Sequence, residues 1–253
     1  WAASGIDSGG DHTGFVYDTA AFELVSTFTV PDSISPSFAH DILRGQFRPT
    51  GTGGDTDFYI YTTHLKAGGG DTARRANEAA AIRADVDSLG QGADVWVMGD
   101  FNIQTSDEPA YRNFLASGAG QLFDPIDTPG EWNNNPVFKS VHTQNPQVGG
   151  PGGMDDRLDF QLATAEVFDD EGLRLIEGSY RVTGNDGSHT FNSDITTGNG
   201  APANVLTALA RASDHLPVVA DYRIGDPVPG ISIVASDAAT TVSESGLNDT
   251  YTV

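Results

Sequence analysis

The chain has 253 residues, of which 38% are hydrophobic, so it can bury a full-sized core. Its 35 acidic residues outnumber its 13 Lys and Arg and give a formal net charge of -22, which argues against tight, non-specific binding of DNA because like charges repel at long range. Without any cysteine, the chain can form neither a disulfide nor a thiolate metal site.

The amino-terminal segment shows no targeting signal. Residues 1–5 lack the basic and apolar regions of a signal peptide, and no apolar run in the sequence is long enough to span a bilayer. We therefore expect the natural start to lie upstream of Trp1. Apolar and aromatic residues then predict two short strands around a turn, at 14–18 and 21–25.

A strand followed by a helix is the clearest local pattern. Aromatic and β-branched residues predict a strand at 58–63 that leads directly into His64 and then into a Gly-rich loop. Asp71 or Thr72 can cap the next helix, and Gly90 can end it. The three- and four-residue spacing of a buried helical stripe is set by Ala79, Ile82, Val86 and Leu89.

Further elements follow as far as residue 222 and alternate between strands, helices and irregular stretches. In chain order they are a buried-type strand at 95–98, a short helix at 109–115, a Gly-, Pro- and Asn-rich loop from 118 to 153, a strand at 158–162, an irregular stretch at 185–200, a helix at 203–210 and a strand at 216–222. A loop as long as the one from 118 to 153 is usually functional or disordered.

The carboxyl-terminal part of the sequence predicts a second unit. Two prolines and a glycine make 226–230 an interdomain linker, which leaves 1–225 as the main domain. Residues 231–253 are similar to the first strands of a Calx-beta-like β-sandwich module, so we expect the start of such a module there.

Polar side chains cluster just beyond the predicted strand ends. Loops at one edge of a sheet can direct several side chains at one ligand, so these segments predict a common reactive edge. They are Thr63-His64-Leu65, Gly99-Asp100-Phe101-Asn102, Arg157-Leu158-Asp159-Phe160 and Ser213-Asp214-His215. Any one of these segments could be an ordinary turn or cap, whereas the ordered set favours a functional site.

In this order, the four segments resemble the motifs of the endonuclease/exonuclease/phosphatase superfamily, the deoxyribonuclease I-like proteins. Phe160 stands where Tyr is frequent in that family. The resemblance implies an α+β fold, a two-layer β-sandwich flanked by helices, here with the start of an all-β module at the C-terminus. It also implies a hydrolase that cleaves phosphodiesters with the help of a metal.

The resemblance implies a role for each side chain. Asp100 would orient or deprotonate the attacking water, and the amide of Asn102 would donate to a phosphate oxygen. His215 would contact the phosphate, with its tautomer set by Asp159. His64 would be a second imidazole, as general acid or phosphate ligand.

The resemblance also implies a divalent cation, Mg²⁺ or else Mn²⁺ or Ca²⁺, with Asp214 and Asp100 as ligands. The family's main metal ligand, a Glu in an early Gln-Glu motif, and an Asn on the first strand are not recognisable before Gly14. We expect both to lie upstream of Trp1, so that the main domain is incomplete at its N-terminus. We therefore expect these 253 residues alone to be catalytically inactive and unstable as an isolated monomer.

Several conspicuous residues carry weaker predictions. Trp132 could stack on a base or sugar, or it could hold its loop against the core. Arg74 and Arg75 could attract phosphate, although a solvated helix face is the simpler reading. Surface or structural positions are expected for His142 and His189, a turn for Asn185-Asp186-Gly187, and a solvated acidic turn without catalytic role for Asp155-Asp156.

Three functions remain open from the sequence. The leading one is a secreted, extracellular nuclease, whose substrate is nucleic acid. The second is a phospholipid or sugar-phosphate phosphodiesterase or phosphatase, which the acidic surface favours slightly. The third is a non-catalytic structural or adhesive module of a large extracellular, multidomain protein, in which the chain would self-associate or contact neighbouring β-modules.

Overall fold

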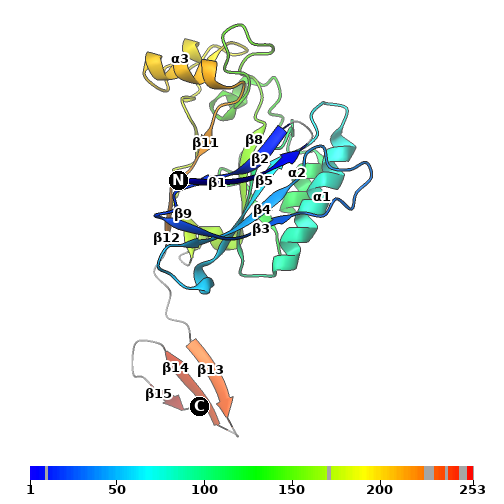
Figure 1. The fold of residues 1–253 in the computed structure, drawn as a ribbon. Helices are drawn as coiled ribbons and strands as arrows, with labels where there is room; N and C mark the ends of the chain where they lie inside the picture. Colours follow the sequence, from blue (N-terminus) through cyan, green and yellow to red (C-terminus); the bar gives the residue numbers. More distant parts are fainter. Residues whose placement is uncertain (9–10, 170–171, 225–230, 237–238, 245–249, 253) are drawn as a thin grey trace.

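The computed structural model describes residues 1–8, 11–169, 172–224, 231–236, 239–244 and 250–252 (Figure 1). Its centre is a six-stranded mixed sheet in the order β3-β4-β5-β6-β8-β7, in which β5 and β6 are parallel and the other neighbours are antiparallel. Its strands are β3 (Phe22–Thr29), β4 (Leu43–Pro49), β5 (Phe58–His64), β6 (Asp94–Asp100), β7 (Leu122–Phe123) and β8 (Asp159–Thr164).

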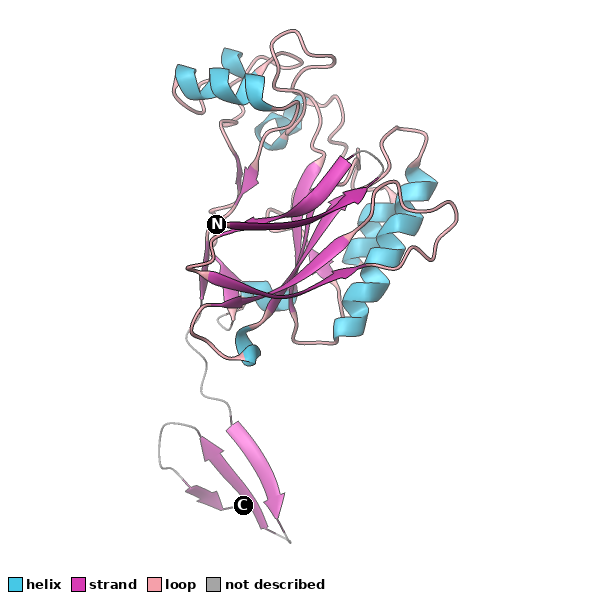
Figure 2. Cartoon of the chain, viewed as in Figure 1, coloured by secondary structure: helices cyan, strands magenta, loops and turns pink. Residues whose placement is uncertain are grey.

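Two helices cover one face of this sheet, as the cyan ribbons in Figure 2 show. They are α1 (Thr72–Leu89) and α2 (Pro109–Leu115). The predicted stop of α1 is confirmed, because Gly90 has a φ of 87°, a conformation that favours glycine. Asp71 occupies the N-cap position, but its side chain accepts no capping hydrogen bond.

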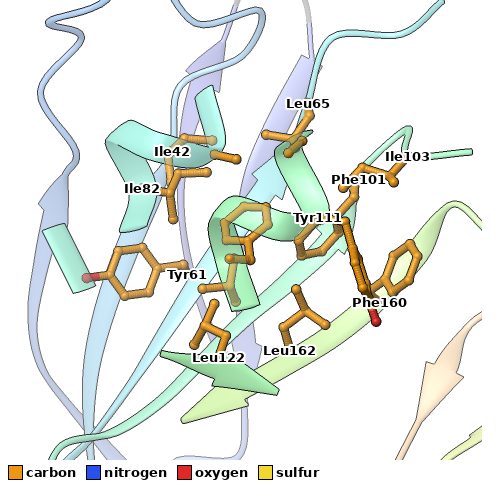
Figure 3. Close-up of a cluster of buried hydrophobic side chains, with 14 of the residues drawn as sticks. Ile42, Tyr61, Leu65, Ile82, Phe101, Ile103, Tyr111, Leu122, Phe160 and Leu162 are labelled. Atoms are coloured by element: carbon orange, nitrogen blue, oxygen red, sulfur yellow. The ribbon is translucent and has the colours of Figure 1, made fainter. Parts of the chain in front are cut away.

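The main core lies between these helices and the sheet (Figure 3). Alternate residues of each strand face the helices, so Val95 and Val97 of β6 pack with Ile82 and Val86 of α1. Phe101 extends this core beyond the end of β6, where its ring meets Phe114 and Phe160 edge-on at centroid distances of 5.3 and 5.2 Å.

The opposite face of the sheet carries a second core beneath short two-stranded ladders. These ladders pair β1 (Ala2–Ser8) with β2 (Asp11–Tyr17), β9 (Leu173–Leu175) with β12 (Tyr222–Ile224), and β10 (Arg181–Val182) with β11 (Val218–Val219). A cleft of about 870 Å³ remains open on this face, and Phe15, Phe47, Phe58, Trp96 and Tyr222 are among its lining residues. We call it the apolar cleft.

The segments after β8 add a small helical region. It contains α3 (Ala203–Ala212) and the 3₁₀ helix η4 (Ile195–Thr197), which pack around Leu206 and Leu216. The remaining 3₁₀ helices are η1 (Gly54–Thr56), η2 (Pro136–Val141) and η3 (Ala165–Phe168). Every helix in the described part of the chain is too short or too polar to serve as a membrane span.

The mixed sheet with its flanking helices confirms the predicted α+β class. The two predicted strands near the amino terminus and the turn between them also exist, but these strands do not pair with each other. β2 pairs with β1, whereas β3 pairs with β4 in the main sheet. The predicted linker 226–230 lies outside the described residues. Beyond it, β13 (Ile231–Ser236), β14 (Ala239–Glu244) and β15 (Thr250–Thr252) form an antiparallel sheet, and its assignment to a Calx-beta-like module stays a prediction.

Candidate active site

Three of the predicted residues form a row across neighbouring strands. In the parallel β5–β6 pair His64 stands opposite Asp100, and in the antiparallel β6–β8 pair Asp100 stands opposite Asp159. Paired residues on adjacent strands direct their side chains to the same face of a sheet. The strand ends therefore bring one imidazole and two carboxylates together.

Gly99 allows this row to form. Its φ is 135°, and a Cβ at this position would lie 2.0 Å from the carbonyl oxygen of Thr63 on β5. Any other residue would force the two strands apart just before Asp100. The glycine of the Gly-Asp-X-Asn segment is thus required by the close approach of the two backbones.

Asn102 fixes the carboxylate of Asp100. It adopts a left-handed φ of 51°, which asparagine tolerates better than most residues. Its backbone N–H donates to Oδ1 of Asp100 at 2.8 Å, and its amide Nδ2 donates to Oδ2 of Asp100 and to the carbonyl of Leu65, both at 3.0 Å. In this arrangement the amide of Asn102 orients Asp100, and a donation to phosphate would require it to release one of these partners.

His215 is held by contacts from two sides. Its Nδ1 lies 2.7 Å from Oδ2 of Asp159, and its Nε2 lies 2.8 Å from the amide nitrogen of Gln144. Thr143 supports the pair, because its Oγ1 accepts a hydrogen bond from the backbone N–H of Asp159 at 3.3 Å. The sequence interpretation missed Thr143 and Gln144, which lie in the long irregular loop and belong to none of the four motifs.

All six residues predicted for the site line one pocket of about 390 Å³. They are His64, Asp100, Asn102, Asp159, Asp214 and His215. Ala67 and Gln144 complete its lining. Asp214 is exposed at the rim, whereas the side chains of Asp100, Asp159 and His215 are largely enclosed. Their catalytic and metal-binding roles stay predictions.

The pocket raises the pKa values of two side chains, Asp100 and His215. Burial, reinforced by the charge of Asp159, raises the pKa of Asp100 to about 7. Burial alone would lower the pKa of His215, but the hydrogen bond and charge of Asp159 outweigh it and raise that pKa to about 9. Near neutral pH, Asp100 can therefore exchange a proton while His215 carries a positive charge.

Asp100 lies between the two imidazoles. Its Oδ2 is 3.5 Å from Nε2 of His64 and 4.0 Å from Nε2 of His215. A charged His215 donates from both ring nitrogens, so Gln144 would then present its Oε1 to Nε2, and a neutral ring would receive the amide N–H instead. The arrangement places one carboxyl group between two imidazoles around a single small space.

The described residues do not make a complete metal site. No group of three or more His, Asp or Glu within the described ranges is arranged to hold a metal ion. Three carboxylates line the pocket, but that of Asp159 is engaged by His215. Asp100 and Asp214 remain as oxygen donors of the kind that Mg²⁺ prefers, and two carboxylates fall short of an octahedral shell. We therefore assign no chemical step to a metal.

Arg75 holds the loop beside the pocket. It is fully buried, makes a bidentate ion pair with Glu108 at 2.9 and 3.0 Å, and donates to the carbonyls of Lys66 and Gly68. The expectation of a solvated helix face at Arg75 is therefore wrong, because a paired guanidinium can be buried. Its neighbour Arg74 donates to the carbonyl of Ser37 at 2.6 Å.

The remaining candidates are structural. Trp132 is fully buried, and its Nε1 donates to the carbonyl of Thr128 at 2.7 Å, so it holds its loop against the core. His142 and His189 are buried, and their Nε2 atoms face the carbonyls of Trp132 and Met154. At the 185–187 turn, the side chain of Asn185 accepts from the N–H of Gly187 at 2.9 Å.

Comparison with known proteins decides the fold. A scan against models of protein families finds no match, and a sequence search of curated proteins finds none either. Among solved structures, an endonuclease/exonuclease/phosphatase from Bacteroides vulgatus is similar, with a TM-score of 0.54 at 14% identity over 88% of this chain and 76% of that chain. The chain has the endonuclease/exonuclease/phosphatase fold.

Two further structures share the endonuclease/exonuclease/phosphatase fold with this chain, and both come from Bacteroides thetaiotaomicron. An endonuclease/exonuclease/phosphatase family protein gives a TM-score of 0.52 at 18% identity over 87% of this chain and 72% of that one. A mannosyl-6-phosphatase gives 0.50 at 16% identity over 88% and 77%. The fold implied by the four sequence motifs is thus confirmed, and all four motifs lie at the pocket edge of its main sheet.

Proposed function

We propose that the chain is a hydrolase of phosphate esters, and more narrowly a metal-dependent phosphodiesterase that acts on nucleic acid outside the cell. The observation that carries the proposal is the position of Asp100 between the imidazoles of His64 and His215, in a pocket where Asp159 holds His215 at 2.7 Å. A general base, a cationic hydrogen-bond donor and a second imidazole are what in-line attack of water on phosphorus requires.

In the proposed reaction, one proton leaves the attacking water and another proton is given to the leaving oxygen. Asp100 accepts a proton from the water as its oxygen bonds to phosphorus, a role that suits a carboxyl whose pKa is raised to about 7. His64 donates a proton to the leaving oxygen as the bond between that oxygen and phosphorus breaks. His215, kept cationic by Asp159, binds a non-bridging phosphoryl oxygen where negative charge accumulates.

The nature of the substrate needs a direct comparison. Nucleic acid is the leading candidate from the motif resemblance. A sugar phosphate is the second candidate, supported by the net charge of -22, which disfavours a long polyanion, and by the mannosyl-6-phosphatase with the same fold. Cleavage of plasmid DNA, RNA, sphingomyelin and mannose 6-phosphate should be measured in parallel with Mg²⁺ or Ca²⁺, using His215→Ala as the control.

Dependence on a divalent cation is the second part of the proposal. Because Asp159 is engaged by His215 and only Asp100 and Asp214 remain as candidate carboxylate ligands in the pocket, calorimetric titration of Mg²⁺ or Mn²⁺ into the 253-residue chain should show weak binding at most. A chelator should abolish the turnover of phosphate esters. Tight one-site binding and normal cleavage by the 253 residues would contradict our expectation that they lack a complete site.

Secretion is the third part of the proposal, and its support is the absence of cysteine together with the strongly acidic composition. Fractionation of the producing cells tests it. Recovery of the protein from the medium or the cell surface is expected. Recovery from the cell interior alone would contradict secretion, and the absence of turnover on every phosphate ester would favour the alternative of a non-catalytic module.

A further inference from the structure

Gln144 lies on a short extended segment between the two strand ends that carry Asp159 and His215. It forms an isolated β-bridge with His215. The preceding residue, Thr143, accepts the N–H of Asp159 through its side chain at 3.3 Å and the N–H of Leu216 through its carbonyl at 2.8 Å. The backbone at 143–144 is therefore fixed by the same segments that position the imidazole.

The side chain of Gln144 points at the pocket side of that imidazole. Its amide nitrogen lies 2.8 Å from Nε2 of His215, whereas the nearest carboxylate oxygen of Asp100 is 4.0 Å from the same atom. The other ring nitrogen is engaged by Asp159. A primary amide can donate through nitrogen or accept through oxygen, so Gln144 can pair with His215 in either charge state.

A phosphoryl oxygen bound by His215 needs the position that Gln144 now occupies. A hydrogen bond to an imidazole nitrogen lies close to the ring plane at a donor–acceptor distance of about 2.8 Å. A bound oxygen must therefore displace the amide, but the other non-bridging oxygens of the same phosphoryl group lie within its reach. The displaced amide can donate to one of them and so exchange one hydrogen bond for another.

Because the pocket is lined by carboxyl groups, a neutral hydrogen-bond donor at position 144 favours the binding of an anionic ligand. Asp100, Asp159 and Asp214 already line it, so an anionic ligand meets three carboxyl groups. An amide offers an N–H without adding a proton equilibrium, whereas a carboxylate of the same shape would add repulsion. The residue type at 144 therefore bears directly on affinity for an anionic group.

We propose that Gln144 is a substrate-binding residue whose amide occupies the phosphoryl-oxygen position beside His215 in the free protein and donates to a second oxygen of the same group when a phosphate ester binds. The inference rests on the proposed function for the identity of the substrate group. It adds to the site a contact that none of the four sequence motifs contains.

The test uses inorganic phosphate as the probe and the protein in a form that circular dichroism shows to be folded, at fixed ionic strength. Ring signals of His215, assigned by their loss in His215→Ala, are followed by NMR as phosphate is added. Gln144→Met keeps the length of the side chain and removes the amide, and Gln144→Glu adds a charge. Gln147→Glu is the matched control, because it adds the same charge three residues further along at a position that does not line the pocket.

We expect phosphate to shift the His215 signals of the wild type. Gln144→Met should weaken phosphate binding about tenfold, as loss of one charge-assisted hydrogen bond does. Gln144→Glu should weaken it by more than tenfold, because repulsion adds to that loss, and Gln147→Glu should stay within about twofold, as for a surface change away from the site. Circular dichroism verifies that each variant is folded, and if Gln144→Glu does not fold, Gln144→Met alone decides.

Two outcomes would overturn the inference. One is phosphate binding by Gln144→Met that equals the wild type, and the other is a wild type whose His215 signals do not respond to phosphate. Turnover of phosphate esters is measured separately. A form of the protein that holds its divalent cation and binds phosphate through Gln144 but hydrolyses no ester would refute the proposed function alone, and a form that hydrolyses esters while Gln144→Met binds phosphate normally would refute this inference alone.

Discussion

The polar pocket and the apolar cleft lie on the same face of the main sheet, the pocket at the ends of β5 and β6 and the cleft further back along both strands. At the end of β5, His64 lines the pocket while Thr63 lines the cleft, and at the end of β6, Asp100 lines the pocket while Gly99 lines the cleft. Trp96 and Met98 of β6 point to the same face as Asp100, so one side of this strand changes from apolar to polar at its end. The comparison teaches that chemistry and stability should be separable here by position along the strands.

Substitutions in the pocket should lower turnover strongly and leave stability nearly unchanged. In a catalytically competent form of the protein, Asp100→Ala or His215→Ala should lower turnover roughly a hundredfold to ten-thousandfold, the usual scale for losing an acid-base or charge-stabilising group. Thermal unfolding should change little, because these side chains are not part of either hydrophobic core. Steady-state kinetics check the effect, and near-wild-type turnover would show that the assigned roles are wrong.

Substitutions in the apolar cleft should lower stability and leave turnover unchanged. Phe47 is 3% exposed and meets the rings of Phe15 and Tyr17 edge-on, so Phe47→Ala should lower the free energy of unfolding by about 3 kcal/mol. Turnover per folded molecule should not change. Urea denaturation measures the loss. Val16→Ala is the control, because Val16 is 75% exposed on the rim of the same cleft and should cost less than about 0.5 kcal/mol.

Gly99 connects the two regions and should affect both. Gly99→Ala places a Cβ against the carbonyl of Thr63 in a conformation that alanine disfavours, so we expect a loss of about 2 to 3 kcal/mol in stability and a displaced Asp100. Gly70→Ala is the matched control, since a Cβ there would meet no atom within 4 Å. Equal stability of the two variants would contradict the close approach of β5 and β6.

A smaller effect is expected from the buried histidine under the pocket loop. Burial lowers the pKa of His142 to about 4, below its ordinary value of 6.5, so folding excludes its proton. This contribution to stability is present above pH 6.5 and is lost as the pH falls through 4. Lowering the pH from 7 to 5 should therefore reduce the free energy of unfolding by on the order of 2 kcal/mol. Urea unfolding at both pH values should show a smaller difference for His142→Gln than for the wild type.

The sequence predicted the strand-end residues well because their signals are local. Each signal can be recognised within a short stretch of sequence. These signals are the apolar run before Asp100, the aromatic run before His64 and the apolar stripe of α1. The ordered motifs then connected distant strand ends, which periodicity alone cannot do. The positions of these residues could therefore be stated before the fold was known, whereas their chemical roles stay predictions.

The parts that could not be predicted depend on distant partners. Gln144 reaches a histidine 71 residues away from within a loop that has no period. Arg75 occupies a buried helical position only because Glu108, 33 residues further on, neutralises it. The segment that forms β1 has no apolar alternation, so its pairing with β2 left no local signal.

The ion pair of Arg75 and Glu108 has a consequence for the tolerance of the pocket to salt. Mobile ions screen exposed charges over about 8 Å at physiological ionic strength, but they do not enter a site where the guanidinium is fully enclosed. The same guanidinium also binds the carbonyls of Lys66 and Gly68. The position of the loop at Ala67 is therefore held by contacts that high ionic strength does not weaken. The position of this rim should therefore be as well defined in seawater as in dilute buffer, although the acidic surface around it responds strongly to the change.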